Sequence, residues 1–283
     1  ENKVIVVKQR WSGNGQIALM VDKVIELQTD GGTQCFPFYL YEKIETQQTG
    51  NDDLFDNNDN QTSTDGYTRK DAISADGLAH FKIAYPSESF SKEDMFYYIY
   101  GLLHSPEYRE RYADNLTKEL PRIPCVQTAG DFWLFSKAGR DLAELHINYE
   151  TVDCYPVTLE GVTNKLTAEA YYVTKMKFGK KKEDGKNVDD KTTVIYNSHI
   201  TINDIPLEAY DYIVNGKPAL SWVMERQAVT TDKKSGIVND ANLWATETMG
   251  NAKYPLELFQ RVITVSLETM KIVNALPKLD IAE

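Results

Sequence analysis

The chain has 283 residues, 42% of them hydrophobic and 26% charged, with a formal net charge of −11. These proportions are typical of a globular protein large enough to bury a core. They exclude a helical membrane protein, because no apolar run approaches the ~18 residues that a membrane helix needs. The negative charge also argues against a protein that coats nucleic acid without sequence preference.

The three cysteines, Cys35, Cys125 and Cys154, lie far apart and form neither a CxxC motif nor a Cys/His cluster. We therefore expect buried, reduced thiols, no metal site and a cytoplasmic location. The chain begins at Glu1 rather than Met. We expect it to be a piece of a longer polypeptide.

Two strands are predicted first, over Lys3–Val7 and Cys35–Tyr41, where β-branched and aromatic residues are dense. The segment Gln47–Gly66 then holds five aspartates and no basic residue, and it is rich in Asn, Gly and Thr. This composition predicts an acidic flexible loop over residues 46–80.

Helical periodicity begins at Ser91, which has Asp94 three residues later, the spacing of a capping box. A second helix is predicted to begin at Ser105-Pro106, with Pro at the first helical position, and to run to about Asn115. A third is expected after Thr128, with Asp131 at the capping position.

Strands return at Ala170–Phe178 and Thr192–Ile202, joined by a polar, lysine-rich segment, which predicts a long antiparallel hairpin. Helices are then predicted from Pro206 to near Gly216, from Pro218, and from Pro255 to about Leu276. Strands, helices, strands and helices in this order indicate an α+β fold. We expect a mixed or antiparallel sheet with a long basic hairpin, packed with several amphipathic helices.

Catalytic motifs are missing from the sequence. It contains no GxxxxGK[ST] phosphate loop and no GxSxG nucleophile turn. The histidines His80, His104, His146 and His199 are scattered singly, and structural roles are favoured for His104 and His146. We expect no catalytic residues, so the chain on its own is predicted not to be an enzyme.

Residues 165–191 carry eight lysines against five acidic residues. Lys175 and Lys177 alternate with Met176 and Phe178, which predicts a strand with one apolar and one cationic face. The candidate phosphate-binding residues of this hairpin are Lys175, Lys177, Lys180, Lys181 and Lys182. The alternative is that these lysines protect an exposed strand against aggregation.

The segment "RQAVTTDKKSGIVNDAN" combines cations with amides and hydroxyls. Arg pairs with guanine and Asn with adenine, whereas Lys and Thr donate to phosphate oxygens. The candidate DNA-binding residues here are Arg226, Thr231, Lys233, Lys234 and Asn239. The alternative is a turn held together by its own Asn, Asp and Ser side chains.

Four long phrases occur together and in order: "YIYGLLHSPEYRERYADNLTKELPRIP", "FSKAGRDLAELHINYE", "YDYIVNGKPALSWVMERQAVTTDKKSGIVNDAN" and "ITVSLETMKIVNALP". With "QCFPFYLYE", they resemble the C-terminal region of bacterial Type ISP-like restriction–modification enzymes, and related phrases occur in adenine-methylating Type IIG enzymes. The resemblance covers nearly the whole chain apart from the acidic loop. It identifies the chain as similar to a C-terminal specificity domain of such a polypeptide.

The resemblance implies a DNA target-recognition domain over residues 81–283, with residues 1–45 bordering a methyltransferase domain. Its function would be to position duplex DNA for adenine methylation and cleavage by methyltransferase, motor and nuclease domains of the parent chain. No cofactor is expected in this piece, whereas the parent would use S-adenosylmethionine, ATP and Mg²⁺. The alternative is a scaffold or coupling module that contacts the methyltransferase and does not bind DNA.

Overall fold

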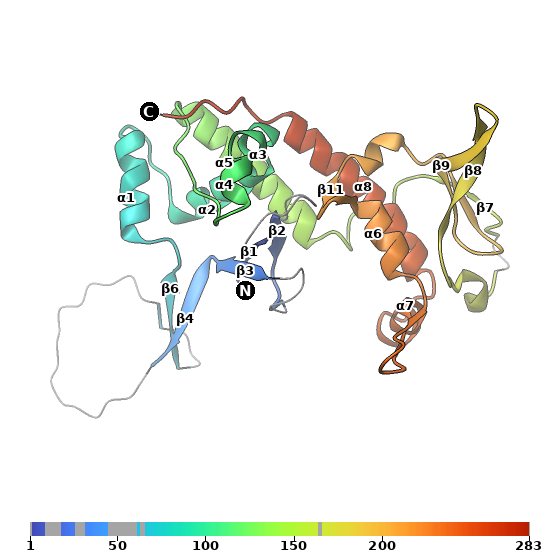
Figure 1. The fold of residues 1–283 in the computed structure, drawn as a ribbon. Coiled ribbons are helices and arrows are strands. Elements are labelled where there is room, and N and C mark those ends of the chain that lie inside the picture. Colours follow the sequence, from blue (N-terminus) through green and yellow to red (C-terminus); the bar gives the residue numbers. More distant parts are fainter. Residues whose placement is uncertain are drawn as a thin grey trace. The chain divides into compact units, whose positions relative to one another are not determined.

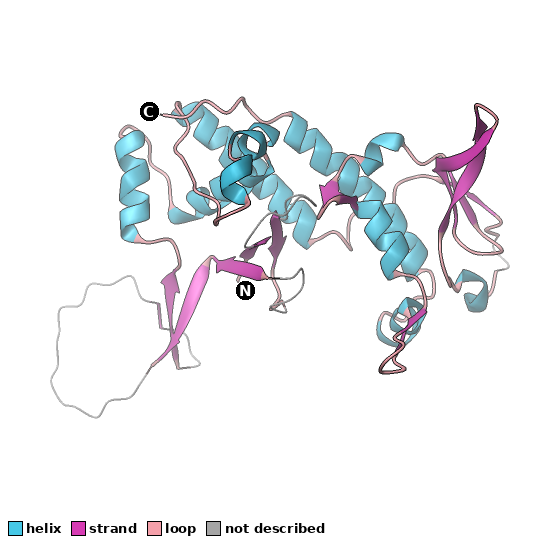
Figure 2. Cartoon of the chain, in the orientation of Figure 1, coloured by secondary structure: helices cyan, strands magenta, loops and turns pink. Residues whose placement is uncertain are grey.

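The computed structural model describes residues 2–8, 18–25, 32–44, 61–62, 66–163 and 166–282. These residues form two compact units (Figure 1). Unit 1 contains the described residues up to Ile147 and those from Ala275 onward, whereas unit 2 contains those of Asn148–Asn274. Helices and strands occur in both units, and every described strand pairing is antiparallel (Figure 2), so the predicted α+β class is confirmed.

Unit 1 contains two small sheets. The first has the order β2-β1-β3, and the second has the order β4-β6-β5. Their strands are β1 (Val4–Lys8), β2 (Ala18–Val21), β3 (Thr33–Pro37), β4 (Tyr39–Lys43), β5 (Gln61–Thr62) and β6 (Tyr67–Asp71). The stretch Cys35–Tyr41, predicted as one strand, is therefore divided between β3 and β4 at Phe38.

The helices of unit 1 are α1 (Ala75–Ala84), α2 (Lys92–His104), α3 (Pro106–Arg111), α4 (Ala113–Leu116) and α5 (Ala129–Ile147). The predicted capping box is confirmed, because Ser91 and Asp94 each accept a hydrogen bond from the backbone N–H of the other. The second helix ends earlier than predicted and continues as α4. The third is capped by Thr128, whose Oγ1 accepts from the Asp131 N–H, so Asp131 lies inside the first turn rather than at the cap.

Helices α2 and α5 cross closely because each has a glycine at the contact. A Cβ atom on Gly101 would lie 2.2 Å from the Phe135 carbonyl oxygen, and one on Gly139 would lie 1.8 Å from that of Tyr97. Buried aromatic rings fill the core beside this crossing, with Tyr98 stacked on Phe132 at 4.9 Å between centroids. The close approach leaves no space for any side chain at either glycine.

Unit 2 is built on a sheet with the order β7-β10-β9-β8. Its strands are β7 (Thr158–Glu160), β8 (Lys177–Glu183), β9 (Lys186–Ile195) and β10 (Thr201–Asn203). The long basic hairpin is confirmed, but its boundaries were wrong. The lysine-rich segment predicted as a linker forms the strands themselves, because Asp184-Gly185 makes a two-residue turn with both φ angles positive, at 49° and 76°.

The rest of unit 2 lies outside this sheet. It comprises η1 (Ala168–Tyr171), η2 (Leu207–Tyr210), β11 (Ile213–Val214), β12 (Lys217–Pro218), α6 (Ala219–Arg226), β13 (Thr230–Thr231), β14 (Val238–Asn239), α7 (Ala241–Leu243), η3 (Trp244–Thr248) and α8 (Tyr254–Asn274). The helix predicted from Pro206 to Gly216 is wrong beyond Tyr210, because Asn215-Gly216 forms a second positive-φ hairpin turn. Phe259 and Ile263 of α8 are fully buried in the core of unit 2.

Several predictions fall partly on residues that the structure does not describe. Of the predicted acidic loop, residues 46–60 and 63–65 lie outside the described residues, whereas 67–71 form β6 and 75–80 begin α1. The functional boundaries at residues 45 and 80 stay predictions. Cys35 is exposed, which corrects its expected burial, while Cys125 is buried and Cys154 half-buried. Of the described helices, none combines the length and apolarity required to cross a bilayer.

Candidate nucleic-acid interface

All ten candidate DNA-binding residues are exposed and lie in unit 2. The five lysines of the first group lie on β8 or just before it, and Thr231, Lys233, Lys234 and Asn239 lie on or between β13 and β14. Arg226 ends α6. The unit carries 15 Lys and Arg against 17 Asp and Glu, so −9 of the net charge of −11 belongs to the rest of the chain. The candidate residues are therefore in the less acidic unit.

The β8–β9 hairpin extends beyond the core of unit 2. Residues 180–187 are exposed without exception, so both faces of this part of the hairpin contact solvent. Nearer the core, Lys175 and Lys177 are exposed, Met176 is buried and Phe178 is half-buried, as the alternation predicted. The hairpin, whose two strands are labelled in Figure 1, thus carries exposed lysines along β8.

The lysines of the hairpin differ in their partners. Lys180 forms an ion pair with Asp189, the residue opposite it on β9. Lys181 and Lys182 lie opposite Val188 and Asn187, which carry no charge. Such exposed pairs contribute only ~0–1 kcal/mol, so Lys180 can exchange its carboxylate for another anion. Because β8 is an edge strand, protection against aggregation also accounts for these lysines, and that alternative stays open.

The second group lies on the β13–β14 ribbon, defined here as residues 230–239, all of which are exposed. Asp232 holds its turn together, because Oδ1 accepts from the N–H groups of Lys234 and Ser235 at 3.0 and 2.7 Å and from the Ser235 hydroxyl at 2.8 Å. The backbone N–H of Ser235 is the main cause that lowers the pKa of the Asp232 carboxyl. Asp232 and Ser235 are therefore structural, as the alternative interpretation predicted.

The base of the ribbon is fixed to the segment that leads into β8. The Asn242 side chain accepts from the Val173 N–H at 2.9 Å and donates to the Val173 carbonyl at 2.9 Å. The Tyr172 hydroxyl donates to Asp240 at 2.7 Å. The Val229 N–H donates to the Thr174 carbonyl at 2.9 Å. These contacts use Asp240 and Asn242 for folding and leave Asn239 exposed.

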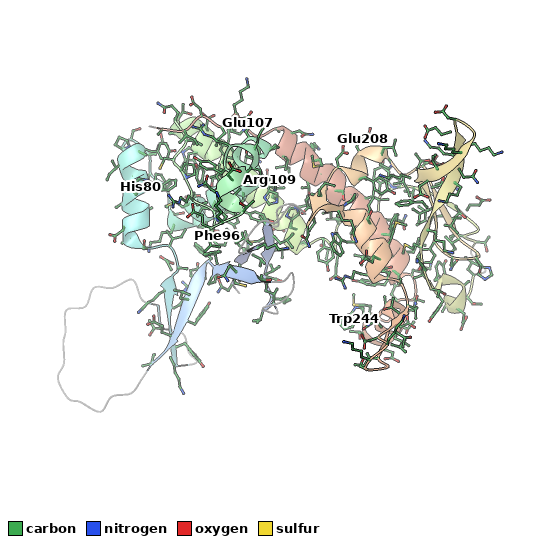
Figure 3. All side chains as sticks on the ribbon, in the orientation of Figure 1. His80, Phe96, Glu107, Arg109, Glu208 and Trp244 are labelled. Atoms are coloured by element: carbon green, nitrogen blue, oxygen red, sulfur yellow. The ribbon has the colours of Figure 1, made fainter. Side chains whose placement is uncertain are left out.

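Exposed apolar side chains in the ribbon and shortly after it were missed by the sequence analysis. Ile237, Val238 and Trp244 are 61%, 55% and 55% exposed, and Figure 3 labels Trp244 at the end of unit 2 that carries α7. Trp244 begins η3, a single turn of π-helix, a form that is frequent at functional sites. The sequence signal that could have identified them is the presence of large apolar residues in a stretch that lacks helical periodicity. Arg226 lies with its guanidinium 5.5 Å from the centre of the Trp222 ring.

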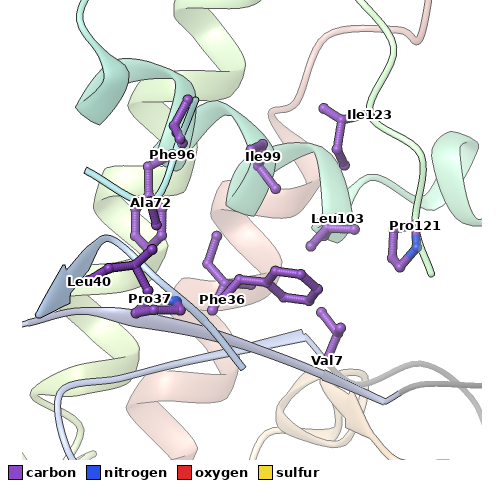
Figure 4. Close-up of a pocket in the computed structure, with 12 residues that line it drawn as sticks. Val7, Phe36, Pro37, Leu40, Ala72, Phe96, Ile99, Leu103, Pro121 and Ile123 are labelled. Atoms are coloured by element: carbon purple, nitrogen blue, oxygen red, sulfur yellow. The ribbon is translucent and has the colours of Figure 1, made fainter. Parts of the chain in front are cut away.

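Unit 1 offers a different kind of surface. A pocket of about 350 Å³ opens between the first sheet and α2 (Figure 4). Its walls are apolar and include Phe36, Leu40, Phe96, Leu103 and Ile123. None of the described residues that line it is titratable, so these residues do not supply the groups that acid–base or nucleophilic catalysis requires. Among the residues that the structure describes, no His, Cys, Asp and Glu cluster could hold a metal ion.

The two buried or half-buried histidines belong to the core of unit 1. His104 Nδ1 contacts the Tyr100 carbonyl at 2.9 Å, and the Tyr100 hydroxyl contacts His146 Nδ1 at 2.6 Å. Burial lowers the pKa of His104 well below its ordinary value and that of His146 to about 4. The predicted structural role is confirmed for both.

Comparison with known proteins gives a consistent result. The search of curated proteins finds no match. Among solved structures, the chain is similar to an "ATP-dependent Type ISP restriction-modification enzyme LlaBIII bound to DNA", with 33% identity and a TM-score of 0.76 over 100% of this chain and 16% of that one. It is also similar to a nuclease-deletion mutant of the Type ISP restriction-modification enzyme LlaGI in complex with a DNA substrate mimic, with 33% identity and a TM-score of 0.72 over 100% of this chain and 22% of that one.

A third similar structure is the DrdV–DNA complex, with 29% identity and a TM-score of 0.74 over 98% of this chain and 25% of that one. The chain thus spans a quarter or less of the length of these proteins. A family model for the Type ISP C-terminal specificity domain matches residues 1–260. This family is defined by specificity rather than by a catalytic activity, in agreement with the prediction from sequence. The chain belongs to the family of Type ISP C-terminal specificity domains.

Proposed function

We propose that this chain recognises a specific duplex DNA sequence as the specificity domain of a restriction–modification enzyme. In this role it positions DNA for adenine methylation and cleavage by other domains of the parent polypeptide. Membership of the specificity-domain family is the observation that carries the proposal, and the similarity to three proteins described as DNA complexes supports it. S-adenosylmethionine, ATP and Mg²⁺ would then bind outside this chain.

The surface of unit 2 supports the proposal physically. A duplex carries a negative charge on every phosphate, and lysines that neutralise phosphates release counterions. Lys181 and Lys182 extend from a hairpin that is solvated on both faces and lie opposite uncharged residues, so their ammonium groups are accessible to phosphates. Phosphate contacts of this kind fix the register of the protein on DNA, while base contacts made elsewhere supply the sequence preference.

Salt dependence of binding tests the proposal. Lys181→Gln with Lys182→Gln should weaken binding and reduce the slope of log K against log salt by about 2, because each phosphate contact contributes about 0.9. The matched control is Lys137→Gln with Lys271→Gln, which removes the same charge from exposed positions on the helices α5 and α8. Equal slopes for the two double variants would contradict a role for the hairpin in binding phosphates.

A second candidate function is a coupling module that contacts the methyltransferase without binding DNA. The apolar pocket of unit 1 favours it, because a pocket with such walls suits an apolar side chain of a protein partner rather than DNA. Under this reading the chain shows no salt-sensitive preference for any duplex over random DNA. A measured preference would exclude it as the sole function.

A further inference from the structure

The β13–β14 ribbon is shaped to enter a groove of DNA. Its ten residues are all exposed, so it projects from unit 2, and its base is held by the contacts of Asn242 and Asp240 with residues 172–173. The major groove of B-DNA admits either an α-helix or a two-stranded ribbon of this kind. A ribbon that is fixed at its base loses little conformational freedom on binding, which favours affinity.

The strand pairing assigns the side chains of the ribbon to two faces. Thr230 pairs with Asn239 and Thr231 pairs with Val238, so each pair shares a face. The Ile237 carbonyl accepts from the Asp232 N–H at 2.9 Å, which continues the pairing by one residue. Because side chains alternate along a strand, Ile237 lies on the face of Thr230 and Asn239. Val238 and Thr231 form the opposite face.

The face of Thr230, Ile237 and Asn239 carries side chains that can recognise an A·T base pair. In the described part of the chain, the Asn239 amide forms no hydrogen bond, whereas the polar groups of Asp232, Ser235 and Asp240 are already engaged. An asparagine amide pairs with N6 and N7 of adenine, and an exposed apolar side chain contacts the 5-methyl group of thymine.

From this arrangement we infer that the ribbon enters the major groove and reads an A·T pair, with Asn239 on the adenine and Ile237 on the thymine methyl. This role depends on the proposed DNA recognition and adds to it the element, the groove and the base pair. Lys233 and Lys234 at the turn lie beside this face, where phosphates border the groove. In this arrangement the lysines of β8 contact the DNA phosphates and position the duplex, whereas the β13–β14 ribbon recognises the base pair.

The test begins with a duplex selected by the 283-residue chain from a random pool, after which each thymine in turn is replaced by uracil, which lacks only the methyl group. One such replacement should weaken DNA binding by the unsubstituted chain about threefold. Ile237→Ala should weaken binding to the thymine duplex by a similar factor and be insensitive to the replacement. Asn239→Ala should cost about fivefold or more and relax the preference for adenine in the same base pair. Val238→Ala is the matched control, since it is a similar residue next to Ile237 on the opposite face.

The outcomes separate this role from the proposed function. If a sequence is selected but no thymine methyl matters, or if Val238→Ala loses the methyl response as Ile237→Ala does, the assignment of this face is overturned while DNA recognition stands. If no sequence is selected, the proposed function itself fails. The role is supported if removal of one thymine methyl group weakens binding by the unsubstituted chain and by Val238→Ala but not by Ile237→Ala.

Discussion

Replacing Asn242 by alanine tests the division of the polar residues after α6 into structural and DNA-facing groups. The Asn242 side chain, 6% exposed, makes two hydrogen bonds of 2.9 Å to the backbone of Val173, which is fully buried. Alanine leaves the Val173 N–H and carbonyl without partners, and each unsatisfied buried group costs ~1–3 kcal/mol. We expect Asn242→Ala to lower the free energy of unfolding of unit 2 by ~2–4 kcal/mol.

Urea unfolding followed by tryptophan fluorescence measures this loss, because Trp222 and Trp244 both lie in unit 2. Asn239→Ala is the matched control. It changes the same residue type three positions away, where the side chain is exposed, so stability should change by no more than about 0.5 kcal/mol. A loss below about 1 kcal/mol for Asn242→Ala, or equal losses for the two variants, would refute the reasoning.

Two further predictions concern unit 1. Gly139→Ala should destabilise the fold by ~2 kcal/mol or more in thermal unfolding, because its Cβ would lie 1.8 Å from the Tyr97 carbonyl oxygen. The control is Gly130→Ala on the same helix. Its Cβ would meet only a side-chain atom at 3.6 Å, so this variant should be close to neutral. Unfolding midpoints in urea should also fall as pH decreases from 7 to 5. The folded-state pKa values of His104 and His146 lie below the ordinary value of 6.5, so the unfolded chain binds more protons in this range. A loss of about 2 kcal/mol is expected for each of the two histidines, and a constant midpoint would contradict it.

Local signals in the sequence predicted the starts of α2 and α3, but they missed α1. The capping box of Ser91 and Asp94 and the Ser105-Pro106 start depend on residues within one turn, so they can be identified without tertiary information. The predicted boundaries of the β8–β9 hairpin followed β-propensity, and the second hairpin was predicted as part of a helix that begins at Pro206. The turns at Asp184-Gly185 and Asn215-Gly216 set the register of their strands, and each dipeptide is present in the sequence.

The division into two units could not be read from the sequence. The division depends on pairing between residues far apart in the sequence. For example, Ile281 forms a β-bridge with Val126, and the Gln127 N–H donates to the Asp280 carbonyl, which joins the C-terminal residues to unit 1. Alternation predicted the exposure of Lys175 and Lys177, whereas Lys180, Lys181 and Lys182 are exposed because both faces of the hairpin contact solvent. The roles of Asn239 and Asn242 could not be predicted from the sequence. Both are asparagines in one polar stretch, and only the fold shows that one is fixed to Val173 while the other is exposed.

The most direct measurement of the central claim is selection of duplexes by this chain from a random-sequence pool at physiological salt, followed by sequencing of the bound fraction. A domain that chooses where the parent enzyme works should enrich one defined sequence, with each mismatched base pair costing ~1–3 kcal/mol. A bound fraction with the same sequence distribution as the starting pool would contradict the claim.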